Sequence, residues 1–230
     1  MLVCCWSPKG GSGTSVVTAA AGLLVARTGR ARIADLTGDQ PAVLGLSAEP
    51  DAGLHDWLRV GAEAPTDALD RIALEVRRNL MLLPTGRPGL GAVLPEAGAA
   101  LAVALDDDSQ TTVCDAGRLD APALLALAEI ADVNVIVVRG CYLALRKAVH
   151  HAAIELVSGV VLIDEHGRSL GARDVEDVLG VPVVATIEAR TSTARAVDAG
   201  VLTSRMPESL ARPLRHGLAR LGCIDGKRAA

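Results

Sequence analysis

The segment best suited to chemistry is a glycine-rich run near the start of the printed sequence, Ser7-Pro8-Lys9-Gly10-Gly11-Ser12-Gly13-Thr14-Ser15. An apolar stretch at residues 2–6 precedes it, and a helical pattern begins at Ser15. In a strand, glycine-rich turn and helix in this order, backbone N–H groups and the helix N-terminus converge on an anion. The segment therefore predicts a phosphate-binding loop and a nucleotide site.

This loop departs from the ordinary phosphate loop at one position. The ordinary motif ends in Gly-Lys-[Ser/Thr], where the lysine reaches the β- and γ-phosphates and the hydroxyl holds Mg²⁺. Here Thr14 stands at the lysine position, Ser15 keeps the hydroxyl, and a different lysine, Lys9, begins the loop. The sequence thus retains the loop amides and the metal-binding hydroxyl without the usual cation.

Short apolar runs alternate with amphipathic segments along the chain, which predicts a doubly wound α/β fold with about seven mostly parallel strands and helices on both faces. The length of 230 residues suits a single domain spanning residues 1–230. Strands are expected at residues 2–6, 31–36, 80–83, 111–115, 133–139, 159–163 and 182–187. Helices are expected at residues 15–28, 53–60, 67–78, 92–105, 121–130, 143–156, 172–179, 192–199 and 208–221.

Two aspartates and one arginine end predicted strands, where ligands of open α/β sheets bind. Asp115 either holds Mg²⁺ through a water or caps the next turn. Asp35 either orients water near the metal or pairs with an arginine at the edge of the core. Arg139 either compensates for the missing lysine or forms a structural ion pair.

The composition excludes several other classes of protein. No run approaches the roughly 20 apolar residues of a membrane span, and no signal peptide is apparent, so a cytoplasmic protein is expected. The five cysteines form no C-x-x-C pair, which disfavours a zinc or iron–sulfur site. The aromatic residues are Trp6, Trp57 and Tyr142, too few for a base-stacking platform.

Positive charge is concentrated at the end of the sequence. The net charge of the chain is −4, and residues 187–230 carry eight Lys/Arg against four Asp/Glu, which is +4 for that part and leaves −8 for the remainder. The predicted last helix places Leu210, Leu214, Leu218 and Leu221 on one face, so we expect it to pack on the core. The alternatives are contact with a membrane surface or with DNA phosphates.

Taken together, these residues resemble the ParA/MinD family of deviant Walker A ATPases of the SIMIBI P-loop type. The family signature Lys-Gly-Gly-x-Gly-Lys-[Ser/Thr] matches residues 9–15 at every position except Thr14. Asp35, Asp115 and the segment 175–187 agree as well. The segment 38–58 looks most like the CpaE/TadZ branch, which is associated with Tad (Flp) pilus placement.

The resemblance implies an ATP- and Mg²⁺-dependent sandwich homodimer. Lys9 and Asp35 are then the expected catalytic residues, with Lys9 reaching the partner's phosphates, and Ser15 and Asp115 the metal-binding residues. The nucleotide-binding residues that it implies are Lys9, Gly10, Gly11, Ser12, Gly13, Thr14 and Ser15.

Three departures from the family bear on its reaction. Thr14 removes a phosphate-neutralising lysine, and Thr37 replaces the second acid of the family's Asp-x-Asp, so we expect slow or absent hydrolysis. Asp164 stands where the branch has an adenine-binding Asn, which leaves base specificity open.

The resemblance predicts an intracellular positioning or partitioning protein that recruits a partner protein, at the membrane or nucleoid, as a weak ATPase or pseudo-ATPase linked to pilus localisation. The alternative is an active ATPase in chromosome or plasmid partition or in division-site selection. An iron–sulfur carrier of related fold is disfavoured because C-x-x-C is missing.

Overall fold

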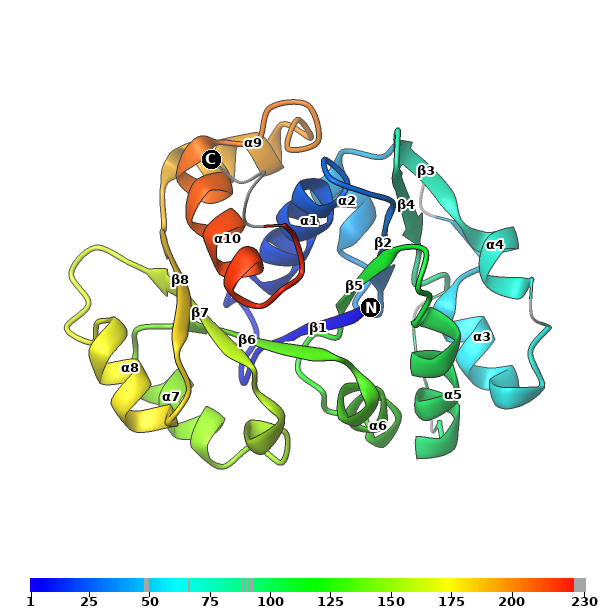
Figure 1. Ribbon diagram of the computed structural model, residues 1–230, viewed down its shortest axis with the longest axis horizontal. Helices are drawn as coiled ribbons and strands as arrows, with labels where there is room; N and C mark the ends of the chain where they lie inside the picture. Colours follow the sequence, from blue (N-terminus) through cyan, green and yellow to red (C-terminus); the bar gives the residue numbers. More distant parts are fainter. Residues whose placement is uncertain (48–49, 66, 88, 90, 92, 226–230) are drawn as a thin grey trace.

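The sheet is the centre of the molecule (Figure 1). The computed structural model describes residues 1–47, 50–65, 67–87, 89, 91 and 93–225. Its sheet has eight strands in the order β3-β4-β2-β5-β1-β6-β7-β8, all parallel except for the antiparallel pair β3–β4. The strands are β1 Leu2–Trp6, β2 Ala31–Asp35, β3 Leu74–Arg77, β4 Leu80–Leu83, β5 Thr111–Asp115, β6 Val133–Arg139, β7 Gly159–Asp164 and β8 Val183–Glu188.

Helices cover both faces of the sheet. Figure 1 shows α1, α2, α9 and α10 on one face and α5, α6, α7 and α8 on the other. The helices are α1 Thr14–Val25, α2 Gln40–Leu44, α3 Leu54–Val60, α4 Ala68–Ile72, α5 Pro95–Leu105, α6 Pro122–Ile130, α7 Tyr142–Val149, α8 Ala172–Leu179, α9 Thr191–Asp198 and α10 Glu208–Arg220, with 3-10 turns η1 Gly61–Glu63 and η2 Ile154–Leu156. The predicted doubly wound α/β fold is confirmed.

The central strands are buried on both faces, as their near-continuous apolar sequences predict. Along β1, Val3 and Cys5 pack in the core beneath α1 and α10, whereas Cys4 and Trp6 pack in the core on the opposite face. Burial raises the pKa of the Cys5 thiol to about 12, so this cysteine is a neutral, small core residue.

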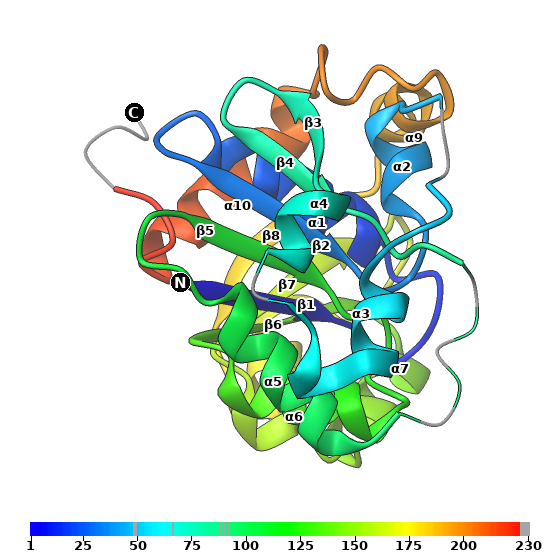
Figure 2. The same cartoon turned by 90° about the vertical axis from the view of Figure 1, so that its right-hand side faces the viewer.

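The sequence-based prediction was wrong for residues 67–78, which form α4 and then the edge strand β3 instead of one helix. In β3, the partly buried Leu74 and Val76 alternate with the exposed Glu75 and Arg77, which is the two-residue period of a strand. Asn79, at φ 66°, turns the chain into β4. The sheet therefore has eight strands where about seven were expected, and Figure 2 looks at the molecule from the side of this hairpin.

Two other helical segments differ from the prediction. The helix expected at residues 143–156 ends at Val149, and η2 follows it. The ring of His151 caps the intervening turn, because its Nδ1 accepts a hydrogen bond from Ala153 N at 3.2 Å. The five-residue α2 was not predicted, and its short length leaves little periodicity to detect.

The last helix packs on the core, as predicted. Leu210, Leu214 and Leu218 are buried, and α10 runs through Pro213 without a break. A Cβ atom at Gly217 would lie 3.1 Å from Ala185 Cβ, so the glycine lets α10 approach β8 closely. Within the described residues, no helix is long and apolar enough to cross a membrane.

The topology places a crevice at the carboxyl end of β1. This strand lies between β5 and β6; β2 to β5 all lie on one side of it, and β6 to β8 follow in order on the other side. Such a switch point leaves the ends of the flanking strands splayed, and ligands of doubly wound sheets bind there. The glycine-rich loop follows β1 at this edge.

Candidate functional site

The glycine-rich loop is folded so that its backbone N–H groups are left free. Gly11 and Gly13 have φ values of 75° and 92°, the left-handed region that glycine adopts without strain. The hydroxyls of Ser7 and Ser12 both donate to the carbonyl oxygen of Lys9 at 2.9 Å, which closes the front of the loop. In the part of the chain that the structure describes, the N–H groups of Gly11, Gly13, Thr14 and Ser15 donate to no protein oxygen. Together with the N-terminus of α1, this is an anion-binding arrangement.

The loop borders a cavity of about 530 Å³, which we call the loop pocket. Its opposite wall comes from the segments that follow β2 and β5, which supply the polar side chains of Thr37, Asp39, Arg118 and Asp120. The pocket is thus built where three neighbouring parallel strands end.

Asp35 lies under this wall and organises it. It is fully buried, and its carboxylate accepts hydrogen bonds from the backbone N–H groups of Thr37 at 3.0 Å, Gly38 at 2.9 Å and Gln40 at 3.1 Å. An aspartate that bonds to the amides just after it is the usual signature of an Asx-type turn. The structure therefore gives Asp35 a definite backbone role, holding residues 36–40 against the end of β2.

Asp115 lies beside Asp35 in the sheet register and is also fully buried. Its Oδ2 accepts a hydrogen bond from Gln40 Nε2 at 2.9 Å, and its Oδ1 accepts one from Gly117 N at 3.3 Å. Burial, together with the negative charge of Asp35, raises the pKa of Asp115 to about 6 in spite of these hydrogen bonds.

Thr37 bridges the two carboxylates. Its Oγ1 lies 3.0 Å from Asp35 Oδ1 and 3.1 Å from Asp115 Oδ2. A third carboxylate at this position would add a like charge beside two buried acids, whereas a hydroxyl can donate its one proton to either of them without adding charge. Thr37 is therefore compatible with two buried aspartates that have no lysine next to them in the loop.

Ser15 and Asp39 provide oxygen atoms at the mouth of the pocket. Ser15 Oγ donates to the exposed Asp39 Oδ2 at 3.1 Å, and Gln40 Nε2 donates to the carbonyl oxygen of Ser15 at 2.9 Å. The oxygens of Ser15, Asp39 and Asp115 are of the hard type that Mg²⁺ prefers. Among the described residues, no three His, Cys, Asp or Glu side chains form a cation site by themselves, so these donors suit an ion that also takes oxygens from phosphate and water.

Asp39, Gln40 and Arg118 were not predicted as site residues from the sequence. Asp39 and Gln40 follow β2 in the short helical turn that was not predicted, and Arg118 lies in a segment without periodicity. The one signal available was their position three to five residues after a strand-ending aspartate, at the edge where ligands bind.

Lys9 and Thr14 are placed differently with respect to the pocket. Lys9 is half-buried at the front of the loop, and its Nζ donates to Gly10 O at 3.3 Å without lining the pocket. Thr14 is the first residue of α1, is 7% exposed, and does line the pocket. Thr14 thus brings a hydroxyl and no positive charge to the pocket.

A second cavity of about 400 Å³ lies on the other side of the loop, and we call it the apolar pocket. It shares Ser12, Gly13 and Val16 with the loop pocket. Its walls include Ile163, Ile187, Val197 and Leu210. The two pockets are therefore adjacent at the N-terminus of α1.

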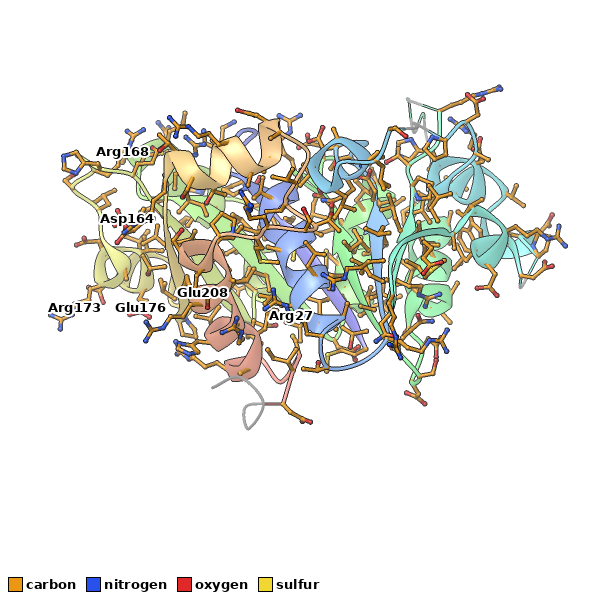
Figure 3. The ribbon with its side chains drawn as sticks, turned by 90° about the horizontal axis from the view of Figure 1, so that it is seen from above. Arg27, Asp164, Arg168, Arg173, Glu176 and Glu208 are labelled. Atoms are coloured by element: carbon orange, nitrogen blue, oxygen red, sulfur yellow. The ribbon has the colours of Figure 1, made fainter. Side chains whose placement is uncertain are left out.

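Arg139 lines the apolar pocket and not the loop pocket. Its guanidinium forms an ion pair with Glu165, the second of the two roles that the sequence left open. Asp164, the last residue of β7, is exposed, and Figure 3 shows it near Arg168 of the segment that follows β7. Arg27 lies just after the other end of α1.

The fold is similar to that of solved structures of ParA and MinD proteins. Three similar solved structures are the MinD septum site-determining protein with Mg-ADP from Pyrococcus horikoshii (18% identity, TM-score 0.79, 99% of this chain and 98% of that chain), a ParA family ATPase from Chlorobium tepidum (18%, 0.76, 95% and 97%) and the MinC:MinD cell division complex of Aquifex aeolicus (16%, 0.73, 97% and 96%). No family model matches the sequence, and no curated protein matches it significantly.

Proposed function

We propose that this protein binds ATP with Mg²⁺ and uses the bound nucleotide to control a positioning or partitioning assembly. The observation that carries the proposal is the set of free N–H groups of Gly11, Gly13, Thr14 and Ser15, at the start of α1 and beside the loop pocket. Groups of this kind bind phosphate through aligned dipoles. The nucleotide named with the similar MinD structure, Mg-ADP, supports the same ligand class.

The different linings of the two pockets suggest the orientation of the bound nucleotide. The loop pocket, with its free amides and hydroxyls, suits the phosphates, and the apolar pocket suits a planar base between aliphatic side chains. The shared residues Ser12, Gly13 and Val16 lie where the two parts of the ligand join. Asp164 does not line the apolar pocket, so base selection rests on other groups, such as Glu188 and Arg190 at its edge.

Ser15 Oγ and Asp115 are the proposed Mg²⁺ ligands, Asp115 through a water, with Asp39 close to Ser15. The ion supplies positive charge to the phosphates, which matters in a loop that has no lysine at position 14. Asp115 is then favoured in its charged form, because a cation lowers the pKa of a neighbouring carboxyl group.

Hydrolysis is proposed to be slow. Thr14 removes one positive charge from the transition state, and the Asp35 carboxylate is occupied by backbone N–H groups. The alternative, an active ATPase, is favoured by one observation: the Asp39 carboxylate borders the loop pocket and is available to orient a water. Turnover of Mg-ATP, lost in Asp39→Asn and kept in Asp177→Asn, would support the alternative, since Asp177 is exposed and lies outside both pockets.

Lys9 supports the proposal of a homodimer. Its side chain does not line the pocket of its own chain, so it is available to the phosphates of a second copy. Nucleotide would then stabilise the dimer, since whatever binds one state selectively shifts the equilibrium toward it. The similar MinC:MinD complex supports recruitment of a partner protein, with the basic residues of α10 as a weaker candidate contact for a membrane or DNA. A cytoplasmic location with peripheral association, and a link to Tad pilus placement, belong to the same proposal.

Calorimetric titration of Mg-ATP, paired with a sizing measurement, tests the proposed function. We expect the wild type to bind Mg-ATP and Ser15→Ala to bind it at least tenfold more weakly, because the metal hydroxyl is lost. Ser204→Ala is the control, since Ser204 lies outside both pockets. A wild type that binds no nucleotide, with or without Mg²⁺, would refute the proposal.

A further inference from the structure

The loop pocket is lined by a positively charged side chain that was not predicted from the sequence to be part of the site. Among the described residues that line it, the one positively charged side chain is Arg118, in the segment between β5 and α6. We propose that Arg118 binds the terminal phosphates of the nucleotide and supplies the positive charge that is missing from the loop because Thr14 stands at the lysine position. This inference rests on the proposed function and deepens it.

The backbone around Arg118 is fixed against the phosphate loop. Gly117 O accepts a hydrogen bond from Ser7 N at 2.8 Å, and Ala116 N donates to Cys5 O at 2.9 Å. Leu119 holds a left-handed φ of 53°, which is unfavourable for leucine, while its side chain is 5% exposed in the core. The segment is therefore held in one conformation on both sides of Arg118.

His151 anchors the same segment from another element. Its Nε2 lies 3.1 Å from Arg118 O, and its Nδ1 accepts a hydrogen bond from Ala153 N. These two partners assign the neutral tautomer with the proton on Nε2, which donates to the carbonyl oxygen. The ring also lies 4.5 Å, centroid to centroid, from Trp6, the last residue before the loop. The backbone of Arg118 is thus connected to the start of the phosphate loop through the contact between the half-buried His151 and the buried Trp6.

The side chain of Arg118, in contrast, is mostly exposed. Its partner is Asp120, at 2.5 Å, and both side chains are more than half exposed, at 55% and 61%. Exposed ion pairs of this kind contribute little, so a ligand with more negative charge can displace Asp120. The planar guanidinium also matches two phosphate oxygens at once.

The other candidate cations are less well placed. Arg139 lines the apolar pocket and is paired with the half-buried Glu165. Lys9 donates to Gly10 O outside the pocket lining. With Asp39 and Asp120 in the same wall, Arg118 is the side chain that can offset acidic charge around a bound triphosphate.

A charge-rescue experiment tests this inference. Binding of Mg-ATP and of AMP is measured for the wild type, Arg118→Ala, Thr14→Lys and the Thr14→Lys/Arg118→Ala double variant. We expect Arg118→Ala to weaken Mg-ATP binding about ten- to a hundredfold and to leave AMP binding unchanged, because AMP lacks the terminal phosphates. The double variant should recover most of the lost affinity.

Arg71→Ala is the matched control and should change the ratio of Mg-ATP to AMP affinity by less than about threefold, since Arg71 forms a similarly exposed ion pair, with Asp67, and lies outside both pockets. Equal Mg-ATP binding by the wild type and a folded Arg118→Ala protein would overturn the role of Arg118 and leave the proposed function intact. No Mg-ATP binding by the wild type would overturn both.

Discussion

Gln40 and Asp115, 75 positions apart in the sequence, are joined by a buried hydrogen bond in which Gln40 Nε2 donates to Asp115 Oδ2 at 2.9 Å. The same amide nitrogen donates to Ser15 O. Gln40 therefore connects the start of α2, the end of β5 and the first turn of α1, which are the three walls of the candidate nucleotide site. The amide oxygen of Gln40 is buried and has no partner among the described atoms, so the contribution of this side chain comes from its nitrogen.

The first prediction concerns this hydrogen bond. Gln40→Met should lower the free energy of unfolding by about 1–3 kcal/mol, because it removes the donor to a buried carboxylate. The loss should be greater at pH 8 than at pH 5, because Asp115 is charged at pH 8 and a hydrogen bond from Gln40 favours its charged form. Urea unfolding at both pH values measures the difference.

Gln110→Met is the control for Gln40→Met, since Gln110 donates to the side chain of Asp107 in a more exposed setting. It should cost less than Gln40→Met. Equal destabilisation by Gln40→Met at pH 5 and pH 8 would contradict the prediction.

The second prediction concerns the pH dependence contributed by Asp115 without ligand. Its pKa is about 6 in the folded chain and 3.8 in the reference state, so between these values the folded protein holds a proton that the unfolded chain has released. Stability from this group is therefore highest at low pH and falls as the pH rises through about 6, by up to about 3 kcal/mol.

Comparison of the wild type with Asp115→Asn isolates this group, since the other carboxylates are common to both proteins. The stability difference, wild type minus variant, should decrease between pH 5 and pH 7. A difference that stays constant across that range would show that the pKa of Asp115 is not raised.

The third prediction is that the Lys9 side chain contributes to dimerisation and not to the stability of the folded chain. Lys9→Ala should change the free energy of unfolding by less than about 0.5 kcal/mol, because the ammonium makes one long hydrogen bond from a partly exposed position. Under the proposed function, the variant should fail to dimerise with Mg-ATP, as measured by light scattering. Lys147→Ala, on the exposed side of α7, should dimerise as the wild type does. Nucleotide-dependent dimers of Lys9→Ala would exclude a role for this lysine across the interface.

The fourth prediction tests the packing of α5 against α6. A Cβ atom at Gly98 would lie 1.7 Å from Ala123 O, a backbone atom that no rotamer change can move. Gly98→Ala should therefore destabilise the protein by about 3 kcal/mol. Gly29→Ala, where a Cβ atom meets nothing within 4 Å, is the control and should have almost no effect on urea unfolding. Similar stabilities of the two variants would mean that the two helices separate at little cost.

The sequence by itself determined the elements that depend on local pattern. β1, β5 and β6 follow from apolar runs that only a sheet covered on both faces can bury, and their observed bounds agree with the predicted ones. The glycine-rich loop is also recognisable from local sequence, because glycine can adopt the left-handed conformation seen at Gly11 and Gly13. The acids at the ends of β2 and β5 could be located from the sequence because parallel strands end at one edge.

The tertiary structure decided what the side chains at that edge do. Asp35 and Asp115 both end apolar strands, yet one binds the N–H groups of its own turn and the other receives the Gln40 amide and a raised pKa. The positions of Asp39 and Arg118 at the loop pocket also depend on segments far apart in the sequence. Hydrogen bonds and desolvation act between atoms brought together by the fold, and a pattern along the chain contains no information on those distances.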